Sequence, residues 1–325
     1  MDYHSSKLDR EASLLISDAR ACLMGVFIIV IMLFHNSFGA LGPISVPFRL
    51  YGHWGVDAFL FLSGFGLYFS LKRTGHSGLL SFYKRRLVRI IPAAVVAGSI
   101  LYACGMSGWL GLLGLNLWYI RTALVLYLSA PFIYEYMVNR NATWVLVCCT
   151  VLGVIGVLVS VPILTHSGFI WQSTVSWTLA RLPVFALGMY IARMNLCVRQ
   201  LMHPAYILFA VLCLFAAMYL HRERELQQSF SSYLHLLPYI LVAFTMPLCM
   251  VLLSLVNPTK LGGVILGYIG SLSLEFYLVH EAIFGRVSAF SHEAAQKFIE
   301  AYGLTAVAAM ALHYCCVFLC RLFRR

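Results

Sequence analysis

The sequence predicts an all-α, polytopic membrane protein with about ten transmembrane helices. Of its 325 residues, 61% are hydrophobic and only 11% are charged, and the mean hydropathy is +0.85. So few polar side chains cannot cover a water-soluble globule of this size. The apolar residues also gather in repeated runs, each long enough to cross about 30 Å of hydrocarbon.

Short connections separate these runs, so we expect one membrane-embedded domain over residues 1–325 and no separate soluble catalytic domain. The third run is short and contains Pro92. The predicted spans cover residues 21–38, 54–70, 90–104, 117–137, 144–163, 176–192, 205–220, 234–256, 263–284 and 303–320.

The distribution of positive charge predicts how the chain is oriented. Most of the 23 Lys and Arg residues lie on one side of the predicted membrane, notably in the N-terminal segment 1–20, the loop 71–89 and the tail 321–325. The positive-inside rule places these segments, and therefore both termini, in the cytoplasm. The net charge of +11 is thus largely a topology signal, and we expect no nucleic-acid partner.

The ten cysteines fall mainly within apolar spans and lack the spacing of metal ligands. We interpret them as small buried hydrophobes, and we expect neither a disulfide framework nor a metal site. Acidic residues such as Asp9 and Glu11 precede the first apolar run, and no small-residue cleavage site clearly follows it. The first span is therefore predicted to be a retained helix rather than a signal peptide.

The loop 71–89 is the candidate for anion binding. Its residues 75–78 predict a turn, and residues 82–91 predict a basic amphipathic helix at the membrane surface. Arg86 and Arg89, spaced i and i+3, lie on one side of that helix, with Arg85 adjacent. Guanidinium groups match phosphate oxygens, although contact with anionic lipid headgroups is the alternative.

His35 is an ionisable residue within the first predicted span, 21–38. It ends the apolar run CLMGVFIIVIMLF, roughly 20 Å along the helix and therefore toward the outer face. Burying such a group is costly, which makes it a candidate functional residue, and imidazole can accept a proton near neutral pH. A histidine that simply ends a helix in the interfacial layer is the alternative.

A second candidate group lies in the ninth span. Ser273, Tyr277 and His280 are spaced i, i+4 and i+7, so they share one helical face. A polar stripe belongs in a protein interior or along a water-filled path, and both catalysis and packing remain open for it. Glu275 is turned away from this stripe.

Three further polar or aromatic residues are candidates for binding an acceptor substrate. Asp57 begins the second span, Ser63 lies deeper beside Gly64, and Trp118 begins the fourth. Close helix packing is the alternative for Asp57 and Ser63. No P-loop, nucleophile elbow or dinucleotide fingerprint is present, which removes the commoner enzyme classes.

Six segments, taken in order, resemble motifs of the integral membrane acyltransferase-3 family. The resemblance extends from residue 23 to about residue 284. The segments are IVIMLFHNS (29–37), GVDAFLFLSGF (55–65), FYKRRLVRIIP (82–92), LWYIRTALVLYLSAP (117–131), RLPVFALGMYIAR (181–193) and SLEFYLVHEAIF (273–284).

The resemblance implies ten helices with both ends in the cytoplasm, and acyl transfer from cytoplasmic acyl-coenzyme A to sugars displayed outside. His35 corresponds to the essential histidine of the first helix, and Arg86 and Arg89 to an R-x-x-R pair. The family usually has Arg or Lys eleven residues before the histidine, where this chain has Met24. Arg20, one turn earlier, could substitute.

On this reading the donor is acyl-coenzyme A, with acetyl the expected acyl group, and no cofactor is permanently bound. The acceptor is a hydroxyl of a saccharide or lipid-linked glycan. His35 would act as a general base, with His280 or Tyr277 assisting, or would itself carry the acyl group transiently. A transporter of a small anion or saccharide, and a scaffold without catalysis, are the alternatives; only the enzyme should consume acyl-coenzyme A in an acceptor-dependent way.

Overall fold

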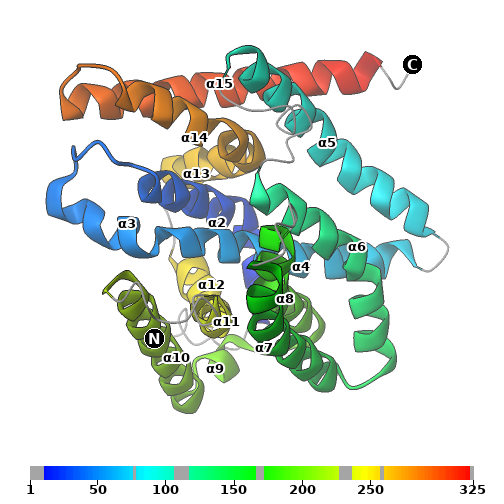
Figure 1. Cartoon of the computed structure of the whole chain (residues 1–325). Helices are drawn as coiled ribbons and strands as arrows, with labels where there is room; N and C mark the ends of the chain where they lie inside the picture. Colours follow the sequence, from blue (N-terminus) through cyan, green and yellow to red (C-terminus); the bar gives the residue numbers. More distant parts are fainter. Residues whose placement is uncertain are drawn as a thin grey trace. The chain divides into compact units, whose positions relative to one another are not determined.

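The computed structural model describes residues 11–75, 78–105, 117–165, 172–226, 236–256 and 260–322. The regular structure of these ranges is helical, apart from one isolated β-bridge between Glu11 and Cys197. Short helical turns lie between some of the long helices: α3 (Val46–Tyr51), α9 (Val198–Leu201), η1 (Gly42–Ser45) and η2 (Gly52–Trp54). The longer helices are α2 (Ala12–Phe34), α4 (Gly55–Thr74), α5 (Leu79–Ala103), α6 (Trp118–Asn139), α7 (Ala142–Thr165), α8 (Gln172–Arg193), α10 (Pro204–Leu226), α11 (Leu237–Ala243), α12 (Met246–Leu255), α13 (Lys260–Ser271), α14 (Ser273–Ser288) and α15 (Ala294–Leu322), as Figure 1 shows.

The predicted all-α, multi-span architecture is confirmed. Within the described ranges, seven helices are long and apolar enough to cross a membrane, and two bent helix pairs raise the number to nine. These nine correspond to nine of the ten predicted spans. The remaining prediction, 117–137, falls on α6, which mixes Arg121 and Glu135 with its apolar residues. The cytoplasmic location of the termini stays a prediction.

The basic segment forms part of a longer helix than the sequence indicated. The predicted surface helix 82–91 and the predicted span 90–104 are one continuous helix, α5, with Pro92 inside it. Helix α4 ends where Gly75 adopts a positive φ of 64°, which glycine reaches without a Cβ clash. The segment predicted as the loop 71–89 therefore contains the end of α4 and the first part of α5, and the predicted turn at 75–78 lies partly outside the described residues.

Two predicted spans are each broken into a bent pair. Helices α11 and α12 meet at 47°, and α13 and α14 meet at 74°. At the first break Pro247 lies in the opening turn of α12, where its missing N–H costs least. At the second break the hydroxyl of Ser271 donates to the carbonyl of Tyr268 at 2.7 Å, which satisfies one acceptor at the end of α13.

The chain forms two compact units whose segments alternate along the sequence. The first contains the described residues among Met1–Arg20, Asp57–Leu79 and Arg121–Asn257. The second contains those among Ala21–Val56, Leu80–Ile120 and Pro258–Arg325. The two units are described separately below.

In the first unit α7 and α8 run side by side (Figure 1), and α8 also contacts α11. Helix α4 approaches α8 at glycines. A Cβ on Gly64 would meet the carbonyl of Phe185, and a Cβ on Gly188 would meet the carbonyl of Phe61. The two backbones therefore touch without intervening side chains.

The second unit contains α14 and α15 side by side (Figure 1), together with α13, α5 and the C-terminal part of α2. Helices α2 and α13 are also joined through glycines. A Cβ on Gly25 would meet the carbonyl of Leu266, and a Cβ on Gly270 would meet the carbonyl of Ala21. This seam positions the helix that carries His35 against the helix that leads into α14.

Candidate functional site

His35 is placed by the end of α2. Its backbone N–H still donates to the carbonyl of Ile31 at 3.2 Å, so His35 continues the last helical turn. The next residue, Asn36, is buried, and its side-chain oxygen accepts a hydrogen bond from the N–H of Phe38 at 3.1 Å. This local turn diverts the chain immediately after the histidine and leaves His35 half-buried.

His280 lies in the middle of α14 and is only 1% exposed. Its Nδ1 is 3.1 Å from the carbonyl oxygen of Phe276 and 3.0 Å from that of Tyr277. Because carbonyl oxygens only accept hydrogen bonds, Nδ1 carries the proton, and Nε2 of the neutral ring has a lone pair. Nε2 is buried and makes no hydrogen bond to the described residues.

The two histidines predicted as catalytic come together in the second unit. Their ring centroids are 5.0 Å apart, with the rings nearly perpendicular at 78°. Tyr277 adjoins the pair, since its ring centroid is 5.7 Å from that of His280. The face predicted from the i, i+4, i+7 spacing is therefore a buried one that meets the end of α2.

Aromatic side chains from α6 extend this cluster. The ring of Tyr119 is 4.8 Å from that of Tyr277, centroid to centroid, and Trp118 is 6.3 Å from Tyr119. Trp118, predicted to bind the acceptor, thus adjoins the cluster through Tyr119. Tyr119 was not predicted as a site residue, although it follows Trp118 in the same motif.

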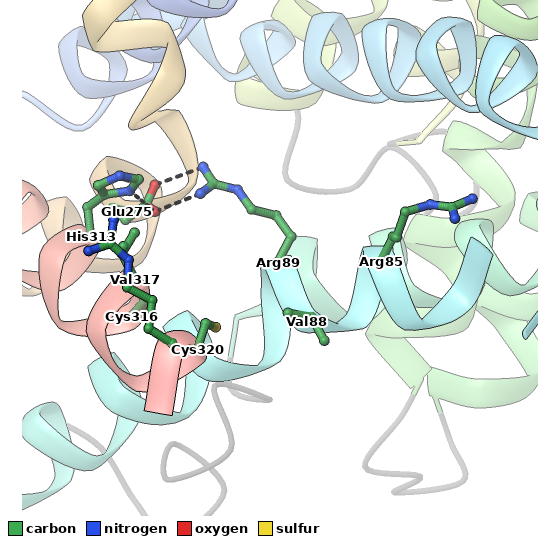
Figure 2. Close-up of a pocket in the computed structure, with 9 residues that line it drawn as sticks. Arg85, Val88, Arg89, Glu275, His313, Cys316, Val317 and Cys320 are labelled. Atoms are coloured by element: carbon green, nitrogen blue, oxygen red, sulfur yellow. Dashed lines mark hydrogen bonds and ion pairs between the residues drawn. The ribbon is translucent and has the colours of Figure 1, made fainter. Parts of the chain in front are cut away.

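A separate cavity of about 340 Å³ lies among α5, α14 and α15 in the same unit. Figure 2 shows its lining, in which charged side chains from three helices converge. The polar residues lining it are Arg85, Arg89, Glu275, His313, Cys316, Cys320 and Arg321. The lining contains three guanidinium groups and one carboxylate, so positive charge is in excess and the cavity is a candidate site for an anion.

Glu275 is the centre of the charged cluster. It is 1% exposed, and its Oε1 lies 3.1 Å from Nη1 of Arg89 and 3.0 Å from Nδ1 of His313. Nη2 of Arg89 donates to Oε2 of Glu275 at 3.2 Å and to the carbonyl of Ser271 at 2.9 Å. These contacts supply the partners that a buried carboxylate requires.

The structure distributes the predicted phosphate-binding arginines unequally. Arg85 and Arg89, spaced i and i+4, line the cavity. Arg86 is not among the residues lining it, and its guanidinium carbon lies 5.9 Å above the ring of Phe82, one turn earlier on α5. The cavity instead takes a guanidinium from Arg321, at the end of α15.

The other two predicted acceptor-binding residues lie in the first unit. Asp57 is 0% exposed, and its Oδ1 is 3.3 Å from Nε of Arg181. The guanidinium carbon of Arg181 lies 4.5 Å from the ring centroid of Trp177 and 4.2 Å from that of Tyr239. Asp57 thus takes part in an enclosed ion pair, and its predicted role in binding an acceptor stays a prediction.

Ser63, one and a half turns further along α4, accepts a hydrogen bond from the hydroxyl of Tyr127 at 3.2 Å. Arg20 also reaches α4, where its guanidinium donates to the carbonyl of Leu62 at 3.4 Å. The adjacent positions of Leu62 and Ser63 bring these two contacts to the same stretch of α4.

Glu275, His313 and Arg321 were not predicted as site residues. Glu275 does face away from His280, as its spacing in the sequence predicts, and it contributes to the cavity instead. The signal that could have found them is charge, since Glu275 and His313 are ionisable groups inside apolar runs.

A multi-span helical protein that pairs a half-buried histidine with a buried one, beside a basic cavity, fits the class of integral membrane acyltransferases. A model of the acyltransferase-3 family, described as an acyltransferase domain, matches residues 21–320. The chain therefore belongs to this family, and the resemblance seen in the sequence is confirmed. No curated protein and no solved structure gives a significant match.

Proposed function

We propose that this acyltransferase transfers an acyl group, with acetyl the expected one, from acyl-coenzyme A to a hydroxyl of a saccharide or lipid-linked glycan. The observation that carries the proposal is the pairing of His35 with His280 at 5.0 Å. The lone pair on Nε2 of His280 makes this a basic centre shielded from bulk water.

The basic cavity supports a donor that carries phosphate groups. Arg85 and Arg321 line it and are exposed, and guanidinium groups match the geometry of phosphate oxygens. Glu275 at this cavity and His280 at the histidine pair lie on the same helix, five residues or about 7.5 Å apart along its axis. A donor held at the cavity by its phosphates could therefore reach the histidines with its thioester end.

The proposed chemistry is a direct transfer. The acceptor hydroxyl oxygen forms a bond to the thioester carbonyl carbon while a histidine of the pair takes the hydroxyl proton. The carbon–sulfur bond then breaks, and coenzyme A leaves as a thiolate that recovers this proton. Tyr277 would stabilise the oxyanion of the intermediate by donating a hydrogen bond. A transient acyl group on His35 is the alternative route, and acyl labelling lost in His35→Gln would support it.

The proposed orientation follows from the positive-inside distribution of Lys and Arg. The donor would enter from the cytoplasm, and the acceptor would be displayed on the other side of a cell membrane. The oligomeric state plays no part in this proposal.

The test is release of coenzyme A from acetyl-coenzyme A by the purified protein in liposomes, with and without glycolipid extract. Wild type should release coenzyme A in an acceptor-dependent way, and His35→Ala and His280→Ala should each slow release by about 10²-fold or more. His292→Ala is the matched control, because His292 is exposed in the segment between α14 and α15. It should stay within about twofold of wild type.

The donor site has its own control. Arg85→Ala should raise the KM for acetyl-coenzyme A by about tenfold, whereas Arg140→Ala, at an exposed position just after α6, should leave it unchanged. A folded, inserted wild type that releases no coenzyme A from acetyl or longer donors would contradict the proposed function. Movement of a saccharide or anion across the liposome membrane in that case would favour the transporter instead.

A further inference from the structure

The break between α13 and α14 lies between the cavity and the histidine pair. Helix α13 ends at Ser271, α14 begins at Ser273, and their axes differ by 74°. Leu272 joins them with φ −99° and ψ 8°. The angle at this joint decides where α14 directs Tyr277 and His280, because both lie in the α14 helix that starts there.

One side chain contacts both sides of the break. The guanidinium of Arg89 donates to the carbonyl of Ser271, the last residue of α13, at 2.9 Å. It also forms a two-pronged ion pair with Glu275, in the first turn of α14, at 3.1 and 3.2 Å. Figure 2 shows the Arg89 side chain directed at Glu275, while Arg85 extends along a different direction.

We infer that Arg89 is a positioning residue that sets the angle between α13 and α14, and thereby the location of His280, rather than a principal ligand of the donor phosphates. This inference rests on the proposed acyl transfer. Three of the five guanidinium N–H groups are used by Ser271 and Glu275. If Arg89 turned to a phosphate, the almost fully buried Glu275 would keep only His313 as a partner among the residues that the structure describes.

The geometry explains why this position requires arginine. A guanidinium is a planar fork that can address a carboxylate with two nitrogens while also reaching a carbonyl. The C-terminal end of α13 carries unsatisfied carbonyls and partial negative charge, which favours a cation there. A lysine ammonium supplies the charge but cannot reproduce the fork.

The test compares Arg89→Lys with Arg85→Lys in the coenzyme A release assay. Arg89→Lys should lower kcat by about tenfold or more and leave the KM for acetyl-coenzyme A within about twofold, since only the placement of His280 changes. Arg85→Lys, the matched control on the same face of α5, should act mainly on KM. Glu275→Gln should repeat the kcat loss, and the double variant with Arg89→Lys should be no worse than either single variant.

Direct binding of desulfo-coenzyme A by the purified variants gives a readout that does not depend on catalysis. Arg89→Lys should bind with a Kd within about twofold of wild type. A Kd or KM raised about tenfold by Arg89→Lys, with kcat retained, would overturn the inference. So would tighter binding in Glu275→Gln, because that result would mean that Glu275 competes with the donor for Arg89.

Glu275→Asp keeps the charge pair and provides a second variant in case Glu275→Gln does not fold. It should give a smaller loss of kcat at unchanged KM, whereas a loss confined to KM would also count against the positioning role. If wild type itself is inactive with every donor, the proposed function fails. If wild type is active and the loss falls on KM, only the role of Arg89 fails.

Discussion

Each of the two units contains an arginine paired with a buried carboxylate, but the two pairs differ in their surroundings. Arg181 is 1% exposed and lies between two aromatic rings, with Asp57 fully buried. The Arg89 side chain is 47% exposed and lines a cavity, with Glu275 buried behind it. The enclosed pair is almost completely shielded from solvent, whereas the open pair lines a cavity, so burial of a charge in a membrane protein does not by itself identify a binding site.

The largest effect on stability should come from breaking the enclosed pair. Arg181→Met leaves the Asp57 carboxylate buried without its partner, which should lower the free energy of unfolding by about 3–5 kcal/mol. Thermal unfolding in detergent measures this. The double variant Asp57→Leu with Arg181→Met should recover most of the loss, because no uncompensated charge remains. Equal destabilisation of the single and double variants would contradict this account.

A smaller loss should follow from separating α4 and α8 in the same unit. A Cβ at Gly64 meets the backbone carbonyl of Phe185, so Gly64→Ala should cost about 1–3 kcal/mol in the same unfolding measurement. Gly303→Ala is the control, because a Cβ there has nothing within 4 Å. It should be neutral or stabilising by up to about 1 kcal/mol, since alanine favours a helix.

The smallest effect on stability should come from substituting a residue that lines the cavity among α5, α14 and α15. Arg85 is exposed, so Arg85→Ala should change the free energy of unfolding by less than about 0.5 kcal/mol while still raising the donor KM. Such a result would separate a functional cluster from a structural one. If Arg85→Ala destabilised the protein as strongly as Arg181→Met, the contrast between the enclosed pair and the lining of the cavity would not hold.

The sequence alone predicted the all-α architecture, which is confirmed, and singled out His35 and His280 as candidate residues, whose catalytic roles stay predictions. Apolar runs of membrane-spanning length are a strong signal, and an imidazole inside such a run is conspicuous, so both His35 and His280 were found. Their proximity could not be derived, because residues 35 and 280 approach one another only through tertiary packing.

The charged cluster was predicted less well, for a geometric reason. Glu275 and His280 lie five residues apart in α14, so Glu275 faces away from His280 and lines the cavity, whose other walls come from distant parts of the sequence. The spacing of Arg86 and Arg89 favoured an i, i+3 pair, whereas the cavity takes Arg85 and Arg89. Asp57 and Arg181, two opposite charges in apolar spans, could have been paired from the sequence by charge alone.

The glycine seam between α2 and α13 has a consequence for access to the histidines. Where Gly25 meets Leu266 and Gly270 meets Ala21, the two backbones leave no room for a single methyl group. This gap is narrower than a lipid tail, a pantetheine arm or a row of water molecules. None of them can therefore pass between α2 and α13 at these glycines. Any molecule that moves to or from the end of α2 must therefore use another route, because along this stretch the seam closes the space between the two helices.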